Sequence, residues 1–237
     1  MVNESEPREG TISSVNHAID VLEFLSENGA ATVTDIAKGT GLPRPTLYRL
    51  LRTLSSRRIT RSDRKRYLLT LRLHELGVRA SGADLLQIRV QPILDHVADE
   101  VGLTAHFAVL DGDAAAYIAK RDVAGAIQMT SRVGWRAPLH CTAVGKVLLS
   151  AAGIPQGLEL TRQTGNTITE RGALAGEIER VRQQGFALDD EELLPGLRCV
   201  AVPLREGASV IGAVSASGRA DQILDPSELA ATLLAML

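Results

Sequence analysis

Apolar residues recur at helical spacing through the first part of the chain, and this pattern predicts three helices in succession. The first covers residues 14–28 and is followed by Gly29, a natural helix end. A short second helix follows, for which Thr34 is the expected N-cap. After a break at residues 39–41 the pattern restarts beyond Leu42 as a third helix. The expected apolar stripes are Val15, Ala18, Ile19, Leu22 and Leu25 in the first helix, Ile36 and Ala37 in the second, and Leu47, Leu50, Leu51 and Leu54 in the third.

Residues 59–70 follow the third helix and form two strand-like runs around a polar turn at residues 62–65. Two helices joined by a tight glycine-containing turn and followed by a hairpin are typical of a winged helix-turn-helix, which presents its second helix to DNA. The chain then carries two further helical patterns, interrupted near Ser81 and Gly82.

The connector after Thr70 is unusually apolar for an exposed linker. We therefore expect it to pack against a symmetry mate or the adjacent domain, so that a dimer presents two DNA readers; packing on its own chain is the alternative. The residues concerned are Leu71, Leu73, Leu76 and Val78.

The second half of the chain is rich in short strands, predicted at residues 104–112, 115–123, 126–133, 186–190, 199–207 and 209–218. Helical stretches lie between them, around residues 142–151 and 170–184, the latter with Thr169 as expected N-cap. Hairpin signals at residues 111–113 and 206–209 favour an antiparallel sheet flanked by helices, an α+β fold. The expected domains are a DNA-binding domain at 1–70, a linker helix at 71–83 and a sensor-type domain at 84–237.

Charge strengthens the assignment of the first domain. The 237 residues carry a net charge of −2, but residues 1–80 carry +4 and the remainder −6. Residues 44–66 contain nine basic side chains against the single acid Asp63. Such a segment suits a polyanion partner. No apolar run approaches the roughly 18 residues that span a bilayer, and the start is too polar for a signal peptide, so we expect a cytoplasmic protein.

The third helix and the hairpin have the chemistry of DNA recognition. Arginine can bind guanine through two hydrogen bonds, and threonine and tyrosine hydroxyls suit phosphates or base edges. A merely solvated basic face is the alternative. The candidate contacts are Arg44, Thr46, Tyr48, Arg49 and Arg52 on the helix, with Arg61, Arg64, Lys65 and Arg66 flanking the groove from the wing.

Residues 134–146 have the ingredients of an anion-holding loop, because Thr142 can cap a helix whose first amides point outward. The spacing is not that of a P-loop, which argues against nucleotide hydrolysis. Side chains on or beside later strands could complete a small polar pocket, with Trp135 and Leu139 at its border. These side chains are Asp189, Cys199, Ser215 and Ser217.

Simpler interpretations of the same residues stay open. Cys199 could be a small core residue, the two serines could fill a crowded sheet face, and Asp189 and Asp190 could be turn residues. A metal site or a cysteine–histidine pair built from His106, His140, Cys141 and Cys199 lacks a characteristic spacing and an orienting acid. We therefore predict no metal, no cofactor and no catalytic residue.

The order of motifs resembles the isocitrate lyase regulator (IclR) family of transcription factors over nearly the whole chain. The motifs are SVNHAIDVLEFL, DIAKGTGLPRPTLYRLLRTL, YLLT, LHELG, RVGWRAPLHCTAVGKVLLS, LPGLRCVAVPL and AVSASG. The resemblance implies a winged helix-turn-helix, a GAF-like effector-binding domain, and dimers or tetramers. It also implies repression or activation of catabolic genes in response to a small carboxylate or aromatic ligand, without enzymatic activity.

The resemblance also assigns roles to residues. It places the start of the recognition helix at Arg44, Thr46, Tyr48 and Arg49, with Pro45 where serine is usual, so that an amide and a hydroxyl are lost there. It implies effector contacts from the backbone amides of Ala143 and Val144 and from the side chains of Asp189, Cys199, Ser215 and Ser217. Many relatives have a longer helix after the last strand, whereas this sequence closes on ELAATLLAML.

Two other classes of function remain as alternatives. In one, the second domain is a small hydrolase or cysteine-dependent catalyst attached to a DNA tether. In the other, the protein is a constitutive DNA-binding scaffold that responds to no effector.

Overall fold

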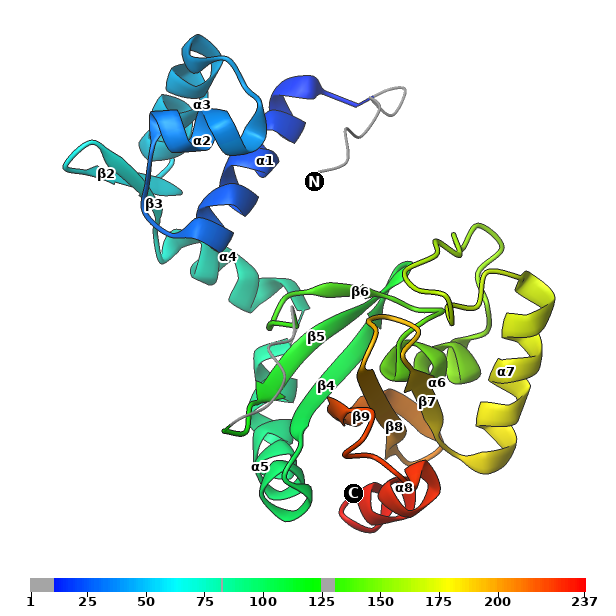
Figure 1. The fold of residues 1–237 in the computed structure, drawn as a ribbon. Coiled ribbons are helices and arrows are strands. Elements are labelled where there is room, and N and C mark those ends of the chain that lie inside the picture. The colour runs from blue at the N-terminus through cyan, green and yellow to red at the C-terminus, as the bar shows by residue number, and fades with distance from the viewer. Residues whose placement is uncertain (1–10, 82, 125–130) are drawn as a thin grey trace. The chain divides into compact units, whose positions relative to one another are not determined.

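The computed structural model describes residues 11–81, 83–124 and 131–237, and its internal contacts divide the chain into two units. The first unit spans Met1–Gly82 and the second spans Ala83–Leu237. Figure 1 labels the helices and strands of both.

The first unit combines helices with a small antiparallel sheet of order β1-β3-β2. A core of fully buried side chains, among them Ile36, Leu47 and Leu51, joins α1, α2 and α3. The predicted inward faces of the second and third helices are thus confirmed. The bounds are α1 (Ser13–Asn28), β1 (Ala31–Thr32), α2 (Val33–Thr40), α3 (Arg44–Ser56), β2 (Thr60–Asp63), β3 (Arg66–Leu69) and α4 (Arg72–Ser81).

The start of α2 differs from the prediction. Its N-cap is Thr32, whose hydroxyl accepts a hydrogen bond from the Asp35 amide at 3.3 Å, while the Asp35 carboxylate accepts from the Thr32 amide at 3.0 Å. Thr34 instead accepts from Arg44 Nη2 at 3.0 Å. Both threonines precede an apolar run, but only Thr32 has an acid three positions later, and this reciprocal pair fixes the cap.

The apolar stripe of α1 is wider than the face that the first unit buries. Val21 and Leu25 are buried, whereas Val15 and Ile19 are 51% and 47% exposed. The helix is confirmed, but the prediction of its inward residues was wrong for Val15 and Ile19.

The second unit is built on a six-stranded antiparallel sheet of order β6-β5-β4-β9-β8-β7. The predicted antiparallel sheet flanked by helices is therefore confirmed. The bounds are α5 (Ala83–Val101), β4 (Thr104–Asp111), β5 (Ala114–Arg121), β6 (Arg136–Pro138), α6 (Ala143–Ala152), α7 (Arg171–Gln184), β7 (Ala187–Asp190), β8 (Leu197–Glu206), β9 (Ser209–Arg219) and α8 (Pro226–Ala235).

Helices cover both faces of this sheet, as Figure 1 shows. On one face, α6 and α7 pack on the sheet through Val147, Leu174 and Ile178. On the other, α5 and α8 pack through Leu94 and Leu233. Each strand therefore alternates between two apolar cores, and a polar side chain that faces either core has to find a partner.

The elements of this unit depart from the predictions at a few positions. The strand expected at residues 126–133 lies largely outside the described residues, and the short strand β6 was not predicted. The N-cap position of α7 is Glu170, which makes no side-chain capping bond, so the prediction of Thr169 was wrong. Thr169 instead accepts a hydrogen bond from Arg162 Nη2 at 3.2 Å. The terminal helix α8 is held by a proper cap, because Asp225 accepts from two of its first amides.

Candidate functional site

The first unit presents α3 behind a tight turn. Gly41 ends α2 in the left-handed conformation, with φ of 71°, and its amide bonds to Ala37 O at 3.0 Å. α3 then starts at Arg44, with Pro43 at the N-cap and Pro45 within the first turn, where a proline sacrifices no helical hydrogen bond. The buried face of α3 leaves its opposite face, which carries the exposed Tyr48, open to solvent.

The basic side chains predicted to contact DNA divide into two groups. Arg44 is engaged with Thr34, and Arg66 donates through Nε and Nη2 to Ala30 O at 3.1 and 2.7 Å. These two arginines brace the unit as well as charging its surface. Within the described chain, no hydrogen bond or ion pair holds the charged groups at the other five positions. Those positions are Arg49, Arg52, Arg61, Arg64 and Lys65.

The wing ends in a two-residue turn of unusual composition. Asp63 pairs with Arg66 across the hairpin, and the two residues between them, Arg64 and Lys65, have φ of 45° and 67°. Two successive positive φ angles are those of a type I′ turn, which normally takes asparagine and glycine. The turn therefore places two cationic side chains at the tip of the hairpin in a backbone conformation that is strained for both residues.

In the second unit, a cavity of about 190 Å³ lies on the sheet face that α6 covers. All six residues proposed as effector contacts line it, although they come from α6 and from three strands. The complete lining is His106, Tyr117, Ser131, Trp135, Thr142, Ala143, Val144, Gln163, Asp189, Leu193, Leu194, Leu197, Cys199, Ser215 and Ser217.

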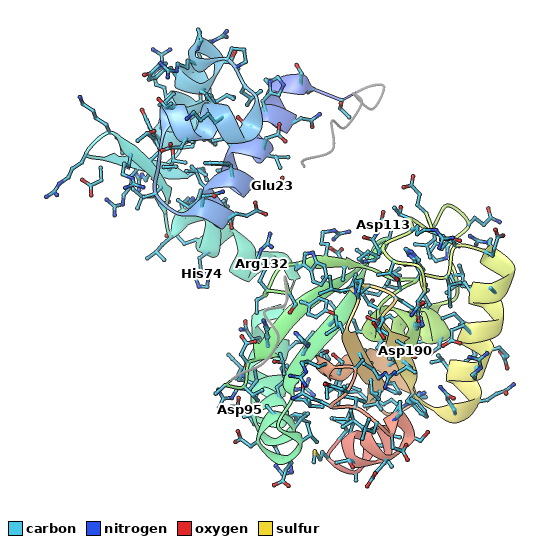
Figure 2. All side chains as sticks on the ribbon, viewed as in Figure 1. Glu23, His74, Asp95, Asp113, Arg132 and Asp190 are labelled. Atoms are coloured by element: carbon cyan, nitrogen blue, oxygen red, sulfur yellow. The ribbon has the colours of Figure 1, made fainter. Side chains whose placement is uncertain are left out.

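Strand register explains why the polar side chains converge. Asp189 on β7 pairs with Cys199 on β8, and Cys199 pairs with Ser217 on β9, so the three form one row across the sheet. Ser215 lies two residues from Ser217 and therefore faces the same side. Asp189 and Asp190 belong to a strand, not to a turn. Asp190, labelled in Figure 2, turns away and accepts from Arg198 Nε at 2.7 Å.

The amino-terminus of α6 forms one wall of the cavity. The Thr142 hydroxyl caps the helix by accepting from the Gly145 amide at 3.1 Å and donates to Pro138 O at 2.7 Å. The amides of Ala143 and Val144 come first in the helix, so they have no intrahelical acceptor. A helix start of this kind attracts a carboxylate. Leu139 is buried behind it and does not line the cavity, in contrast to the prediction, whereas Trp135 does.

Asp189 is the acidic group of the cavity. Its Oδ1 accepts from the amides of Glu192 and Leu193 at 2.9 and 3.3 Å, and its Oδ2 has no hydrogen-bond partner within the described chain. Burial raises the pKa of Asp189 to about 7, against the lowering effect of those two amides and of Lys146. The protonated form is therefore abundant near neutral pH, when Oδ2 can donate a hydrogen bond.

Lys146 on α6 is buried and ties the helix to the segment behind Asp189. Its ammonium donates to Leu188 O at 2.7 Å and to the Glu192 carboxylate, with Glu177 at 3.7 Å. Burial still raises the pKa of Glu192, although the lysine opposes this. The ion pair holds the chain from β7 to Leu193, which borders the cavity.

The cavity also has an aromatic wall, of which only Trp135 was predicted from the sequence to lie at the pocket. His106 on β4 lies edge-on to Tyr117, with ring centroids 5.1 Å apart, and Tyr117 lies 5.3 Å from Trp135. His106 Nε2 is 3.0 Å from Ser131 Oγ. A single histidine within an otherwise apolar strand does not form a recognisable motif. Its position in the cavity wall could be predicted only from the pairing of β4 with β9.

The residues considered for catalysis do not form a reactive centre. Burial raises the pKa of the Cys141 thiol to about 12 and that of Cys199 well above its ordinary range, so neither is a thiolate near neutral pH. In the residues that the structure describes, no three His, Cys, Asp or Glu side chains are grouped to hold a metal ion. No helix of the described chain has the length and hydrophobicity needed to cross a bilayer.

Comparison with known proteins decides the family. The profile of the IclR helix-turn-helix domain matches residues 14–64, and that of the bacterial transcriptional regulator IclR C-terminal domain matches residues 80–237. The chain belongs to the IclR family. It is a helix-turn-helix, DNA-binding transcriptional regulator of that family, as the motifs had indicated.

Individual relatives agree along nearly the whole length. The transcriptional regulators XynR and KdgR of Escherichia coli K12 are each 35% identical, with 92% and 85% of this chain aligned to 90% and 80% of theirs. An IclR homologue from Microbacterium hydrocarbonoxydans, solved in complex with 4-hydroxybenzoate, superposes with a TM-score of 0.78 at 25% identity, covering 94% of this chain and 96% of its own. The Thermotoga maritima IclR gives a TM-score of 0.71 at 27% identity, covering 95% and 97%.

Proposed function

We propose that the cavity of the second unit binds a small carboxylic acid and that this ligand controls the affinity of the first unit for an operator. The observation that carries the proposal is the convergence of the α6 amides with Asp189, Cys199, Ser215 and Ser217 around one cavity. The amides suit the carboxylate, and a protonated Asp189 beside them adds a donor without like-charge repulsion.

The size and lining of the cavity favour an acid with a compact apolar body. A cavity of about 150 Å³ can accommodate benzene, so about 190 Å³ suits a substituted ring of similar size. Tyr117 and Trp135 supply an aromatic wall. The homologue solved with 4-hydroxybenzoate supports an aromatic acid as the first class to test.

On the DNA side, we propose that Arg44, Thr46, Tyr48, Arg49 and Arg52 follow the major groove while the wing residues Arg64, Lys65 and Arg66 neutralise phosphates. Pro45 would shape the helix start without donating a bond. The protein would act in the cytoplasm as a homodimer or tetramer on a palindromic or repeated operator, mainly as a repressor and without enzymatic activity.

Control by the ligand requires two arrangements of the protein that differ in their affinity for it. The raised pKa of both thiols argues against the alternative of a cysteine-dependent catalyst. A constitutive scaffold would not explain a cavity that contains a buried carboxyl oxygen without a partner among the described residues.

The test measures binding of the full-length protein to duplex DNA from upstream of its own gene across a salt series, with and without benzoate and 4-hydroxybenzoate. We expect a steep salt dependence and a loss of about 1–3 kcal/mol of binding free energy in Arg49→Ala. Arg205→Ala, in the exposed β8–β9 hairpin of the other unit, is the matched control and should bind normally.

Absence of sequence preference at every salt concentration would exclude operator recognition. If operator affinity is high but no acid shifts it, the proposed effector class is wrong while the DNA-binding role stands. Ser217→Ala should weaken the response to the acid without changing the affinity of the ligand-free protein for DNA.

A further inference from the structure

One polar group of the cavity has no role in the site described so far. His106 is 1% exposed and lines the cavity, and its Nδ1 has no hydrogen-bond partner among the described residues. It pairs in register with Ser215, whereas Asp189 lies in the neighbouring row and two strands further across the sheet. Three strand spacings of about 4.8 Å separate the strand of His106 from that of Asp189. The cavity therefore has a second polar region, apart from Asp189.

The ring of His106 is held in place from two sides. Its Nε2 is hydrogen-bonded to Ser131 Oγ, and the Ser131 carbonyl accepts from Lys120 Nζ at 2.9 Å. Its ring also forms a T-shaped contact with Tyr117, at an interplanar angle of 88°. Burial, aided by the charge of Lys120, lowers the pKa of His106 to about 3, so the imidazole is neutral at physiological pH. A fixed, neutral ring with one unused nitrogen is suited to a single directed hydrogen bond.

A buried polar atom without a partner costs about 1–3 kcal/mol, so each such atom in a native structure calls for an explanation. Both tautomers of a neutral imidazole are compatible with the bond to Ser131: Nδ1 either accepts or donates. A hydroxyl group meets both cases. A carboxylate can only accept and would lie against an uncharged ring, and an ammonium can only donate.

We propose that His106 is a specificity-determining residue that hydrogen-bonds a hydroxyl group of the effector, so that the ligand class is a hydroxy acid, neither an unsubstituted acid nor a dicarboxylic acid. This inference rests on the proposed function, because it assumes that the carboxylate of the same ligand docks at the start of α6. The aromatic pair Tyr117 and Trp135 then covers the body between the two polar ends.

The experiment uses the full-length protein and titration calorimetry with benzoate, its three monohydroxy isomers and the three benzene dicarboxylates. The isomers vary the direction of the hydroxyl relative to the carboxylate. At least one hydroxy isomer should bind about tenfold more tightly than benzoate, the factor that one well-made hydrogen bond to an otherwise unpartnered group provides. The dicarboxylates should bind no better than benzoate.

Two variants separate the two ring nitrogens. Asparagine carries its amide atoms at the δ position, as Nδ1 is, whereas glutamine carries them at the ε position, as Nε2 is. His106→Asn should keep the preference for the hydroxy isomer, and His106→Gln should lose it. Thr104→Val is the control, because Thr104 lies on the same strand and face, is buried and has an unpartnered hydroxyl, but does not line the cavity. Its preference should be unchanged.

The outcomes distinguish this inference from the function on which it rests. If benzoate binds as tightly as every hydroxy isomer, or if the preference survives in His106→Gln, His106 does not recognise the hydroxyl, while the proposal of acid sensing stands. If a dicarboxylate binds best, the proposal of a hydroxy acid is wrong, while the proposal of acid sensing again stands. If no acid of the series binds and none shifts operator affinity, both proposals fail. If His106→Gln does not fold, the wild-type ranking still tests the hydroxy-acid class, and His106→Asn tests the role of His106.

Discussion

Exchanging the wing-tip residues Arg64 and Lys65 for asparagine and glycine should make the first unit more stable and its DNA binding weaker. With φ of 45° and 67°, both residues occupy the left-handed region, which costs an L-residue with a side chain about 1 kcal/mol. Asparagine followed by glycine is the pair that a type I′ turn prefers. The free energy of unfolding of this unit should therefore rise by about 1–2 kcal/mol in Arg64→Asn/Lys65→Gly.

The same exchange removes two positive charges. Neither charged group is held by another part of the described chain, so both are available to phosphates. Each neutralised phosphate contributes about 0.9 to the slope of log affinity against log salt, and the slope should fall by about 2 in the double variant. The effect should be equal on unrelated duplexes, because phosphate contacts carry no sequence information.

Fluorescence anisotropy with a labelled nonspecific duplex, between about 50 and 200 mM salt, measures the slope. Hydrogen exchange of the first unit in the full-length protein measures its stability. Arg61→Asn is the matched control: it removes one wing charge at a position of ordinary φ, so stability should not rise. If the double variant unfolds more readily than the wild type, the strain argument is refuted; if its salt slope is unchanged, the tip does not reach phosphates.

Three further predictions concern the second unit. Gly145→Ala would place a Cβ 2.3 Å from Leu139 O, so calorimetry should detect a loss of about 1–3 kcal/mol, whereas the control Gly176→Ala, on an open face of α7, should gain about 0.5–1 kcal/mol. Because burial raises the pKa of Asp189 to about 7, the free energy of unfolding should fall as the pH rises from about 4, the pKa in the unfolded chain, to 7. An acid effector should also bind about tenfold less tightly for each pH unit above 7. Asp189→Asn should abolish that decline in affinity. Lys146→Met should cost about 3–5 kcal/mol by stranding Glu192, and adding Glu192→Gln should restore most of it; equal melting temperatures for the single and double variants would contradict this.

The first unit shows what periodicity can and cannot determine. The spacing of the leucines was sufficient to predict the buried face of α3, because this helix packs against the core of the first unit along one side only. It failed for α1, where Val15 and Ile19 continue the apolar stripe beyond the face that the unit covers. Apolar residues on a helix can be buried by a partner subunit as well as by the core of their own chain. The exposed apolar side chains of Val15 and Ile19 therefore agree with the expected self-association.

The cavity shows a different limit. Asp189, Cys199, Ser215 and Ser217 were predicted to line a pocket because each is a polar or reactive residue on or beside a strand, and all four do line the cavity. His106 sits in a strand as well, but its partner Ser131 is separated from it by 25 positions, and nothing local relates the two. Only the antiparallel register that brings β4 beside β9 aligns His106 with Ser215 and turns both toward α6. The residues that we propose to select the acid are therefore brought together by long-range strand pairing, whereas the sequence pattern could predict only a small polar pocket in this domain.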